Sequence, residues 1–183
     1  MINRLFALIV LILLSPIFLA VALAIFTEDG SPIFFKQKRV GINYTFFKIY
    51  KFRSMKKNTP NVATHLLENP GSYLLRIGGV LRKLSLDELP NLINIIKGEM
   101  VFVGPRPALY NQDDLMALRV AAGVDKLKPG ITGWAQINGR DKISIEAKVE
   151  LEKEYLERKS VWFDLVIVVR TFTSVLGSKG VAH

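Results

Sequence analysis

The sequence predicts a mainly helical α+β protein, with a membrane segment at residues 1–29 and one domain at residues 30–183. Three observations lead to this prediction. No residue from Leu5 to Phe26 is charged. Two short segments rich in aromatic residues, Ile33–Phe35 and Phe46–Phe52, have the composition of strands. Much of the remaining chain has the hydrophobic spacing of helices, interrupted by turns that contain proline or glycine.

The apolar segment is long enough to cross a bilayer, since a helix over Leu5–Phe26 would be roughly 33 Å long. Ser15-Pro16 lies near its middle, and a proline there bends a helix. A cleaved signal peptide, a straight span and a re-entrant hairpin are the three interpretations. The apolar run is longer than a usual signal sequence, and Arg4 is the only basic residue before it. Hydropathy favours the straight span, whereas positive charge at both ends favours the hairpin.

The two predicted strands are joined through Gly41-Ile42-Asn43 and carry many cations. These cations are Lys36, Lys38, Arg39, Lys48, Lys51 and Arg53. They form either a solvated face or a surface that faces a membrane or a phosphate. Residues 58–71 then predict a loop, and Tyr73–Lys83 predicts a helix that places Arg82 beside the next segment.

The run Ser85-Leu86-Asp87-Glu88-Leu89-Pro90 places two adjacent carboxylates at a predicted helix start. Apolar residues then recur with helical spacing as far as Gly98, a natural stop. Ser85 and Glu88 have the spacing of a capping box, and Asp87 is the alternative N-cap. Either way, the helix dipole should keep Asp87 ionised and favour a nearby phosphate. The simplest interpretation is that both acids merely start a helix.

The second half of the chain predicts short strands and two long helices. Met100–Val103 predicts a buried strand that ends in Gly104-Pro105-Arg106-Pro107, where two prolines stiffen the backbone around Arg106. An ordinary proline turn is the alternative. The remaining predictions are a helix at Asp113–Ala122, a turn at Pro129–Gly133, a strand at Trp134–Ile137 with a hairpin at Asn138-Gly139, a helix from Ser144 to Lys159, and an apolar helix at Trp162–Leu176 in the core or at a membrane surface.

The composition limits which partners and which catalytic groups the chain can use. The formal net charge is +9, which implies an anionic partner: nucleic acid, anionic lipid or a phosphorylated substrate. The chain has no cysteine, and this excludes disulfides, thiolate catalysis and thiolate metal sites. Its two histidines, His65 and His183, are too few for a metal site built from imidazoles.

Six segments, taken in order, closely resemble the bacterial sugar transferases known as monotopic phosphoglycosyl transferases. They are the apolar segment with Ser15-Pro16, then Phe34–Gly41, Phe47–Met55, Leu81–Pro90, Gly104–Pro107 and Pro129–Arg140. The resemblance covers nearly the whole chain and indicates the minimal, single-domain form of the family.

The resemblance implies an enzyme that starts the assembly of a bacterial glycoconjugate, such as O-antigen, capsule or a glycoprotein glycan. Its substrates would be a UDP-sugar, an N-acetylhexosamine or a derivative, and polyprenol (undecaprenyl) phosphate, and UMP would be released. The family nucleophile maps onto Asp87, which would form a covalent phospho-sugar intermediate with support from Glu88. Mg²⁺ is the implied cofactor, with Asp87 as its ligand.

The resemblance also implies attachment to the cytoplasmic face of the bacterial inner membrane. A re-entrant helix–break–helix hinged at Ser15-Pro16 replaces the straight span that hydropathy favoured. Ala7 stands where many members carry an acid. Amphipathic helices, including the C-terminal one, would lie in the lipid interface around the catalytic domain. The oligomeric state is left open.

Because both implied substrates are anionic, cations are needed beside the attacking carboxylate. The substrate-binding candidates are Lys51, Arg53, Arg82, Pro105, Arg106, Pro107, Gln136 and Arg140. The planar fork of arginine suits bidentate contact with phosphate.

Two other functions compete with this interpretation. A membrane-anchored basic protein that binds nucleic acid or lipid would explain the charge, but it gives Asp87 and Glu88 no task. The enzyme interpretation expects no nucleic-acid partner. A secreted hydrolase with a cleaved signal would need two facing carboxylates, whereas adjacent helical residues point about 100° apart.

Overall fold

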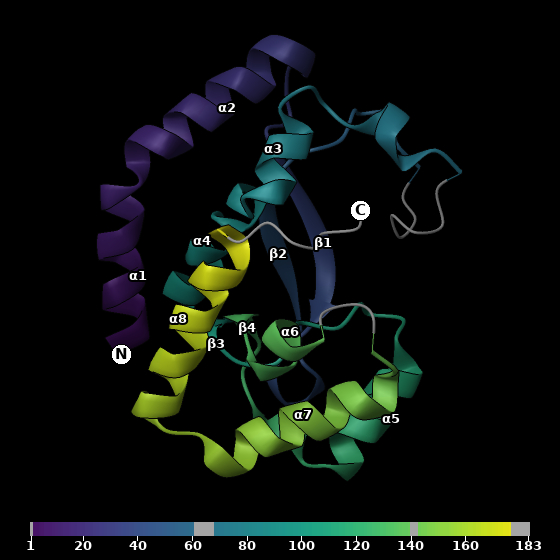
Figure 1. Cartoon of the computed structure of the whole chain (residues 1–183). Helices are drawn as coiled ribbons and strands as arrows, with labels where there is room; N and C mark the ends of the chain where they lie inside the picture. Colours follow the sequence, from purple (N-terminus) through teal and green to yellow (C-terminus); the bar gives the residue numbers. More distant parts are fainter. Residues whose placement is uncertain (1, 61–67, 140–142, 177–183) are drawn as a thin grey trace.

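Helices make up most of the described chain, and two small sheets lie between them, which confirms the mainly helical α+β prediction (Figure 1). The computed structural model describes residues 2–60, 68–139 and 143–176. The helices are α1 (Ile2–Leu13), α2 (Ser15–Asp29), α3 (Gly78–Lys83), α4 (Asn91–Lys97), α5 (Asp113–Ala121), α6 (Trp134–Asn138), α7 (Ile145–Arg158) and α8 (Val161–Leu176). The strands are β1 (Phe34–Val40), β2 (Phe46–Phe52), β3 (Val101–Val103) and β4 (Gly130–Thr132).

The apolar segment is bent at Ser15-Pro16, which agrees with the helix–break–helix that the resemblance implies and not with the straight helix that hydropathy favoured. α1 and α2 meet at an angle of 63°. Pro16 has no N–H to donate to the carbonyl of Ile12, and the Ser15 hydroxyl donates to that carbonyl instead, at 2.7 Å. Among the described residues no single helix is both long and apolar enough to cross a bilayer, although the bent pair meets that test jointly.

Both ends of the bent pair are fixed to the same body of the protein. On α1, Ala7 is fully buried in a cluster with residues of β2 and α4. A larger side chain would separate α1 from that cluster, which accounts for the small residue at this position. At the end of α2, the buried guanidinium of Arg53 donates to the carbonyls of Gly30 and Pro32 and pairs with Asp29.

The antiparallel pairing of β1 with β2 confirms the predicted hairpin and sorts its cations onto two faces. In the register, Lys36 is opposite Tyr50 and Gln37 is opposite Ile49. Because side chains alternate across a strand, Gln37, Arg39 and Lys51 share the inner face. The exposed Lys36, Lys38 and Lys48 share the other face.

The predicted strand at Trp134–Ile137 is wrong, because that segment is helix α6 and the strand comes earlier. Gly130–Thr132 forms β4 and pairs in parallel with β3. At Gly133 a Cβ would lie 2.2 Å from the carbonyl oxygen of Gly104, so only glycine fits where the chain leaves the sheet. Trp134 then packs against Phe163 of α8 with its ring tilted by 55° and ring centroids 4.9 Å apart, and this packing stabilises the helical turn.

The helix predicted at Tyr73–Lys83 is only half correct. Leu74 forms a bridge with Met55, and the backbone N–H of Leu75 donates to Ser54 at 3.0 Å. These contacts extend the chain, so that α3 begins only at Gly78. The loop predicted at residues 58–71 lies partly outside the described residues, since 61–67 are not among them.

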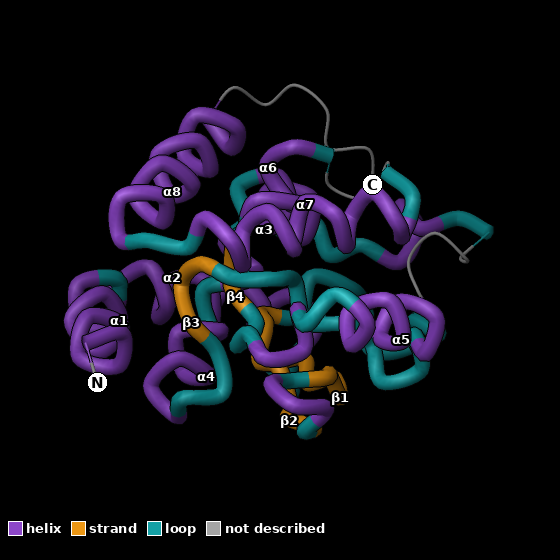
Figure 2. The backbone as a smooth tube through the Cα atoms, turned by 90° about the horizontal axis from the view of Figure 1, so that it is seen from below, coloured by secondary structure: helices purple, strands orange, loops and turns teal. Residues whose placement is uncertain are grey.

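The predictions for the later helices are confirmed. α5 covers the predicted Asp113–Ala122 to within one residue, and Ser144 caps α7 by accepting from the backbone N–H of Ala147 at 3.2 Å. α8 buries Phe163 and Ile167, while its other face is exposed. Seen from below, α1 and α8 lie toward one side of the molecule and α5 toward the other (Figure 2).

Candidate active site

The two adjacent carboxylates lie on a short turn between α3 and α4, and the predicted caps are wrong. Leu86–Glu88 is a single 3-10 turn that follows Ser85 in a left-handed conformation, φ 55°. Neither Ser85 nor the residue before α4 makes a side-chain capping hydrogen bond. The turn therefore presents both carboxylates away from the backbone and leaves them available for other contacts.

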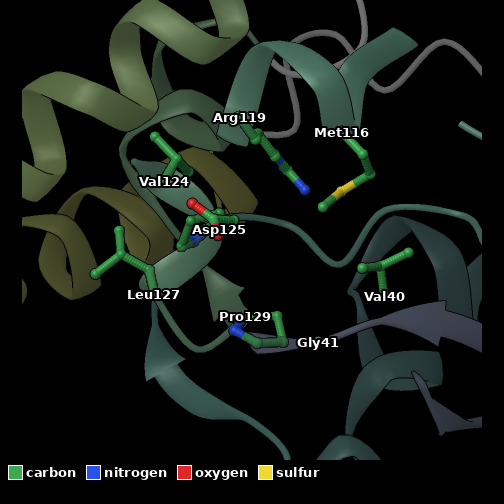
Figure 3. A pocket seen from close by; sticks show the side chains of 9 residues that line it. Val40, Gly41, Met116, Arg119, Val124, Asp125, Leu127 and Pro129 are labelled. Carbon is green, nitrogen blue, oxygen red and sulfur yellow. The ribbon is translucent and has the colours of Figure 1, made fainter. Parts of the chain in front are cut away.

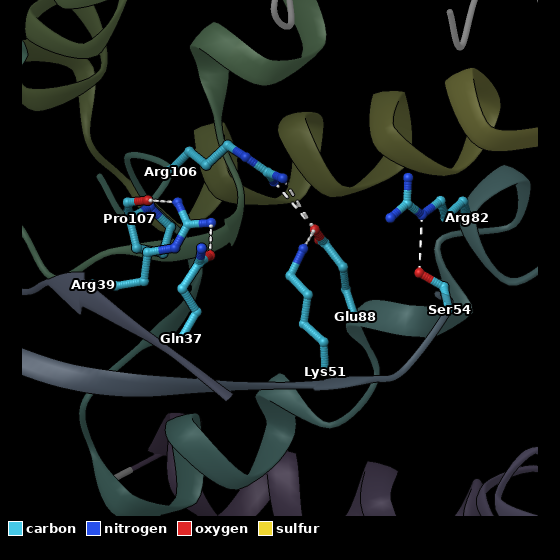
Figure 4. A network of polar contacts seen from close by, with 8 residues as sticks. All are labelled: Gln37, Arg39, Lys51, Ser54, Arg82, Glu88, Arg106 and Pro107. Atoms are coloured by element: carbon cyan, nitrogen blue, oxygen red, sulfur yellow. Dashed lines mark hydrogen bonds and ion pairs between the residues drawn. The ribbon is translucent and has the colours of Figure 1, made fainter. Parts of the chain in front are cut away.

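Glu88 is held by two cations from different parts of the chain (Figure 4). Lys51 Nζ from β2 lies 2.7 Å from Glu88 Oε1, and both terminal nitrogens of Arg106 lie 3.2 Å from the same oxygen. Burial alone would raise the pKa of Glu88, but the charges and hydrogen bonds of Lys51 and Arg106 lower this pKa to about 2. Glu88 is thus an anion at every physiological pH.

Asp87 has the opposite environment. Its carboxylate makes no protein hydrogen bond within the described part of the chain, and the residue is half-buried. Burial raises its pKa and the Glu88 charge adds to that, while Lys51, Arg82 and Arg106 act to lower it. The sequence-based expectation considered only the helix dipole, which favours the ionised form of Asp87, whereas burial acts in the opposite direction. Two neighbouring carboxylates with opposite pKa shifts suit different chemical roles.

A small cleft opens beside Glu88. Its lining includes Arg39, Lys51, Glu88, Asn91 and Arg106. Asn91 is 1% exposed, and its Oδ1 has no hydrogen-bond partner among the described residues. A concentration of cations and an unpaired amide oxygen is suited to a phosphorylated ligand that also carries hydroxyl or amide groups.

Arg82 acts on the charge of Asp87 from α3, whereas Lys51 acts from β2 and Arg106 from the proline-flanked loop. Its Nε donates to the hydroxyl of Ser54 at 2.9 Å, which fixes the guanidinium (Figure 4). Burial lowers the pKa of Arg82 and the charge of Asp87 opposes that shift. Asp87 is therefore placed between cations, where an attacking carboxylate and an incoming phosphate are both stabilised.

The structure brings together only part of the predicted substrate-binding set. Lys51, Arg82 and Arg106 surround the carboxylates, and Pro107 lines the cleft. The structure does not bring Arg53 to the carboxylates: it is 7% exposed and its guanidinium binds the end of α2. These contacts give Arg53 a structural role.

Among the other predicted residues that the structure describes, Pro105, Gln136, Ser15 and Pro16 do not line the cleft. Pro105 accepts a hydrogen bond from the N–H of Gly130 at 2.9 Å, at the base of the loop. The amide atoms of Gln136 are buried without a partner among the described residues. Arg140 lies outside the described residues. Ser15 and Pro16 form the bend between α1 and α2.

The substrate-binding candidates chosen from the sequence did not include Arg39 or Asn91. Arg39 was one of the strand cations that could face a phosphate, and only strand alternation, once the register is known, places it on the same face as Lys51. Asn91 follows Glu88 by three residues, a spacing that brings two residues onto one face of a helical turn. Neither signal is specific without the fold.

The chain is similar to known proteins over most of its length. The family model described as "Bacterial sugar transferase" matches residues 1–178. The chain is 44% identical to an uncharacterized sugar transferase, EpsL, of Bacillus subtilis, over 83% of this chain and 74% of that protein. It is 40% identical to the exopolysaccharide production protein ExoY of Sinorhizobium fredii, over 97% of this chain and 85% of that protein.

A further relative is named by its reaction. The chain is 40% identical to the UDP-glucose:undecaprenyl-phosphate glucose-1-phosphate transferase of Escherichia coli. The similarity covers 90% of this chain but 37% of that longer protein.

Proposed function

Because the chain belongs to the bacterial sugar transferase family, we propose that it transfers a sugar phosphate from a UDP-sugar to polyprenol phosphate and releases UMP. It is a phosphoglycosyl transferase, the class of enzyme to which its named relatives belong. The observation that carries the proposal is the site itself, in which the unpaired carboxylate of Asp87 lies among the charges of Lys51, Arg82 and Arg106.

We propose a two-step reaction on Asp87. Its carboxylate oxygen attacks the β-phosphorus of the UDP-sugar, the bond from that phosphorus to the bridging oxygen breaks, and UMP leaves with the bonding electrons. The resulting acyl phosphate carries the sugar. An oxygen of polyprenol phosphate then attacks the same phosphorus, and the carboxylate of Asp87 is released.

Lys51, Arg82 and Arg106 have the charge needed to hold the diphosphate against the repulsion of the carboxylate. Glu88 keeps two of these cations in place, since Lys51 and Arg106 share one of its oxygens. Glu88 is therefore proposed to support the site without forming the covalent bond.

The residues present fit a magnesium ion bound mainly by the substrate. Within the described ranges there is no group of three or more His, Cys, Asp or Glu residues that would form a complete metal site. Mg²⁺ is often held by one or two carboxylates together with substrate phosphates and water. Asp87 has a free carboxylate for this purpose, whereas Glu88 is occupied by Lys51 and Arg106. When bound, the ion would neutralise the diphosphate and the departing UMP.

A panel of UDP-sugars with undecaprenyl phosphate, scored by UMP release, tests the activity and identifies the sugar. UDP-N-acetylhexosamines are the expected donors, and UDP-glucose is the comparator because a relative is named for it. Release of UMP that depends on both substrates supports the proposal. Salt-sensitive binding of nucleic acid with no UMP release from any donor would favour the rival basic-binding function instead.

We also propose that the bent pair α1–α2 enters the cytoplasmic face of the inner membrane as a re-entrant hairpin. Its outer surface exposes many large apolar residues, among them Leu5, Ile9, Ile12, Leu19, Leu23 and Phe26. Such a surface is unfavourable in water and suits a lipid environment. Both ends of the pair bind the same domain, a geometry that a hairpin satisfies and that a straight span does not.

The C-terminal helix is proposed to rest on the same membrane. α8 exposes Val161, Trp162, Leu165, Val169 and Phe172 along one face. Because the opposite face is packed on the domain through Phe163 and Ile167, α8 would lie in the interface rather than cross the bilayer.

The hairpin proposal predicts labelling from one side of the membrane. The chain has no cysteine, so Asn3→Cys and Ser31→Cys can each be labelled singly in oriented vesicles. Both should react from the side that also labels the control Lys159→Cys, an exposed position in the catalytic domain. Labels on opposite sides would show a true span. Pro16→Ala restores a backbone donor at the bend and should shift the outcome toward that span.

The raised pKa of Asp87 predicts the acid limb of the pH profile. Only the ionised carboxylate attacks, so kcat/KM should fall as the pH drops through a pKa above the ordinary aspartate value of 3.8. Lys51 lowers this pKa, so Lys51→Met should move the limb to higher pH. Lys48→Met, on the exposed face of the same strand, should leave the limb where it is. An unshifted limb in Lys51→Met would show that another group controls the profile.

A further inference from the structure

The four consecutive backbone carbonyls from Pro105 to Ala108, in the loop that carries Arg106, each accept a hydrogen bond. Pro105 accepts from the N–H of Gly130 at 2.9 Å, and Ala108 accepts from the N–H of Val40 at 3.0 Å. The two carbonyls between them accept from arginine side chains: Arg119 Nη2 donates to Arg106 at 2.9 Å, and Arg39 Nη1 donates to Pro107 at 3.0 Å. A loop without these contacts would present its side chain in several directions.

The two arginines that hold the loop differ in position. Arg39 lines the cleft, and its other terminal nitrogen donates to Gln37 at 2.6 Å. Arg119 comes from α5 and extends into a small cavity behind the loop, together with Met116 and Val124 (Figure 3). Arg119 is 5% exposed and does not line the cleft, so it has no route to a substrate there.

A buried carboxylate fixes Arg119 in turn. Glu152 of α7 is 2% exposed, and its carboxylate accepts a hydrogen bond from Arg119 Nε at 2.7 Å. Arg119 Nη2 donates both to Glu152 and to the backbone carbonyl of Arg106. A planar guanidinium can make all of these contacts at once, whereas an ammonium group cannot. A buried ion pair contributes little net stability but gives a fixed geometry when each partner is fully bonded.

We propose that the Arg119–Glu152 pair is a positioning device for the reaction, which acts by holding the backbone carbonyl of Arg106 from behind. The inference rests on the proposed role of Arg106 at the diphosphate. The chain of contacts runs from α7 through α5 to the loop, and then through the Arg106 guanidinium to Glu88, beside Asp87. The pair thereby sets where the positive charge of Arg106 lies when phosphate arrives.

A double-mutant cycle tests the proposal. Arg119→Met with Glu152→Met removes the pair without leaving a lone buried charge. It should lower kcat/KM for UMP release by about 10- to 100-fold, the scale expected when a catalytic group is misplaced by an ångström. In an Arg106→Met background the same pair of substitutions should change kcat/KM by less than about twofold, because the group being positioned is absent.

A control and a second variant distinguish a loss of Arg106 positioning from a general loss of folding stability. Ile167→Ala removes a fully buried side chain from α8 that takes no part in the hydrogen bonds holding the loop, and it should lower the Tm with little effect on kcat/KM. If the paired variant shows no cooperative unfolding, Arg119→Lys, which keeps the charge opposite Glu152, replaces it in the same cycle. Equal losses with and without Arg106, or no loss in the parent chain, would overturn the proposal. A parent chain that releases no UMP would instead count against the proposed function.

Discussion

Asp87→Asn should abolish both UMP release and the covalent intermediate. The amide keeps the shape of the side chain but lacks the anionic oxygen that attacks phosphorus, so turnover should fall by at least about 10³-fold. Incubation of the parent chain with its UDP-sugar and Mg²⁺, without polyprenol phosphate, should add the mass of one phospho-sugar. Fragmentation should place that mass on Asp87, and the variant should show no added mass.

Two matched variants make this result specific. Glu88→Gln weakens the hold on Lys51 and Arg106, so turnover should fall while the adduct remains on Asp87. Asp113→Asn changes an exposed aspartate in the first turn of α5 and should leave both measurements unchanged. A mass on Glu88 would reverse the roles of the two acids. Turnover without any adduct would mean that polyprenol phosphate attacks the UDP-sugar directly.

The local sequence was sufficient to predict those parts of the site whose residues lie within one short segment of the chain. The two carboxylates lie side by side in the sequence, and Arg106 stands between the two prolines that stiffen its loop. In the structure the Arg106 guanidinium donates to Glu88, so the two segments meet at one site. The caps failed because Ser85 adopts a left-handed conformation, which no propensity signals for serine. The chain needs that turn to pass from α3 to α4.

Residues whose role depends on distant contacts could not be predicted. Lys51 and Arg53 are two apart and look equivalent in a strand pattern. β2 ends at Phe52, however. The side chain of Lys51, within the strand, binds Glu88, whereas the side chain of Arg53, just beyond the strand, binds the segment at the end of α2. Arg119 and Glu152 are 33 residues apart, and nothing in either segment relates them to the Arg106 loop. Tertiary packing alone assigns these roles.

The strand that was wrongly predicted at Trp134–Ile137 has the same explanation, because tertiary packing decides the structure of this segment. An aromatic and aliphatic run before Asn138-Gly139 is typical of a hairpin. The strand position beside β3 is taken by Gly130–Thr132, because glycine at 104, 130 and 133 lets the two segments approach closely. In the helix, Trp134 packs against Phe163 and its indole N–H donates to Glu154, so both its ring and its polar group have partners.

Removal of Mg²⁺ should stop the first step, and restoring the ion should recover it. The attacking carboxylate and the diphosphate repel each other, and Glu88 already neutralises part of the charge of Lys51 and Arg106. EDTA should therefore lower UMP release by at least about 100-fold, a loss of about 2.7 kcal/mol in transition-state stabilisation. The adduct on Asp87 should disappear with it.

The experiment that adds Mg²⁺ back must distinguish an ion bound at the site from a general effect of ionic strength. Mg²⁺ in excess of the chelator should restore both UMP release and the adduct, whereas sodium chloride at the same ionic strength should restore neither, because screening acts weakly inside a half-buried site. Full turnover in EDTA would show that Lys51, Arg82 and Arg106 stabilise the attack without a metal. Recovery with sodium chloride alone would show that the ion acts only through ionic strength and that Asp87 is not its ligand.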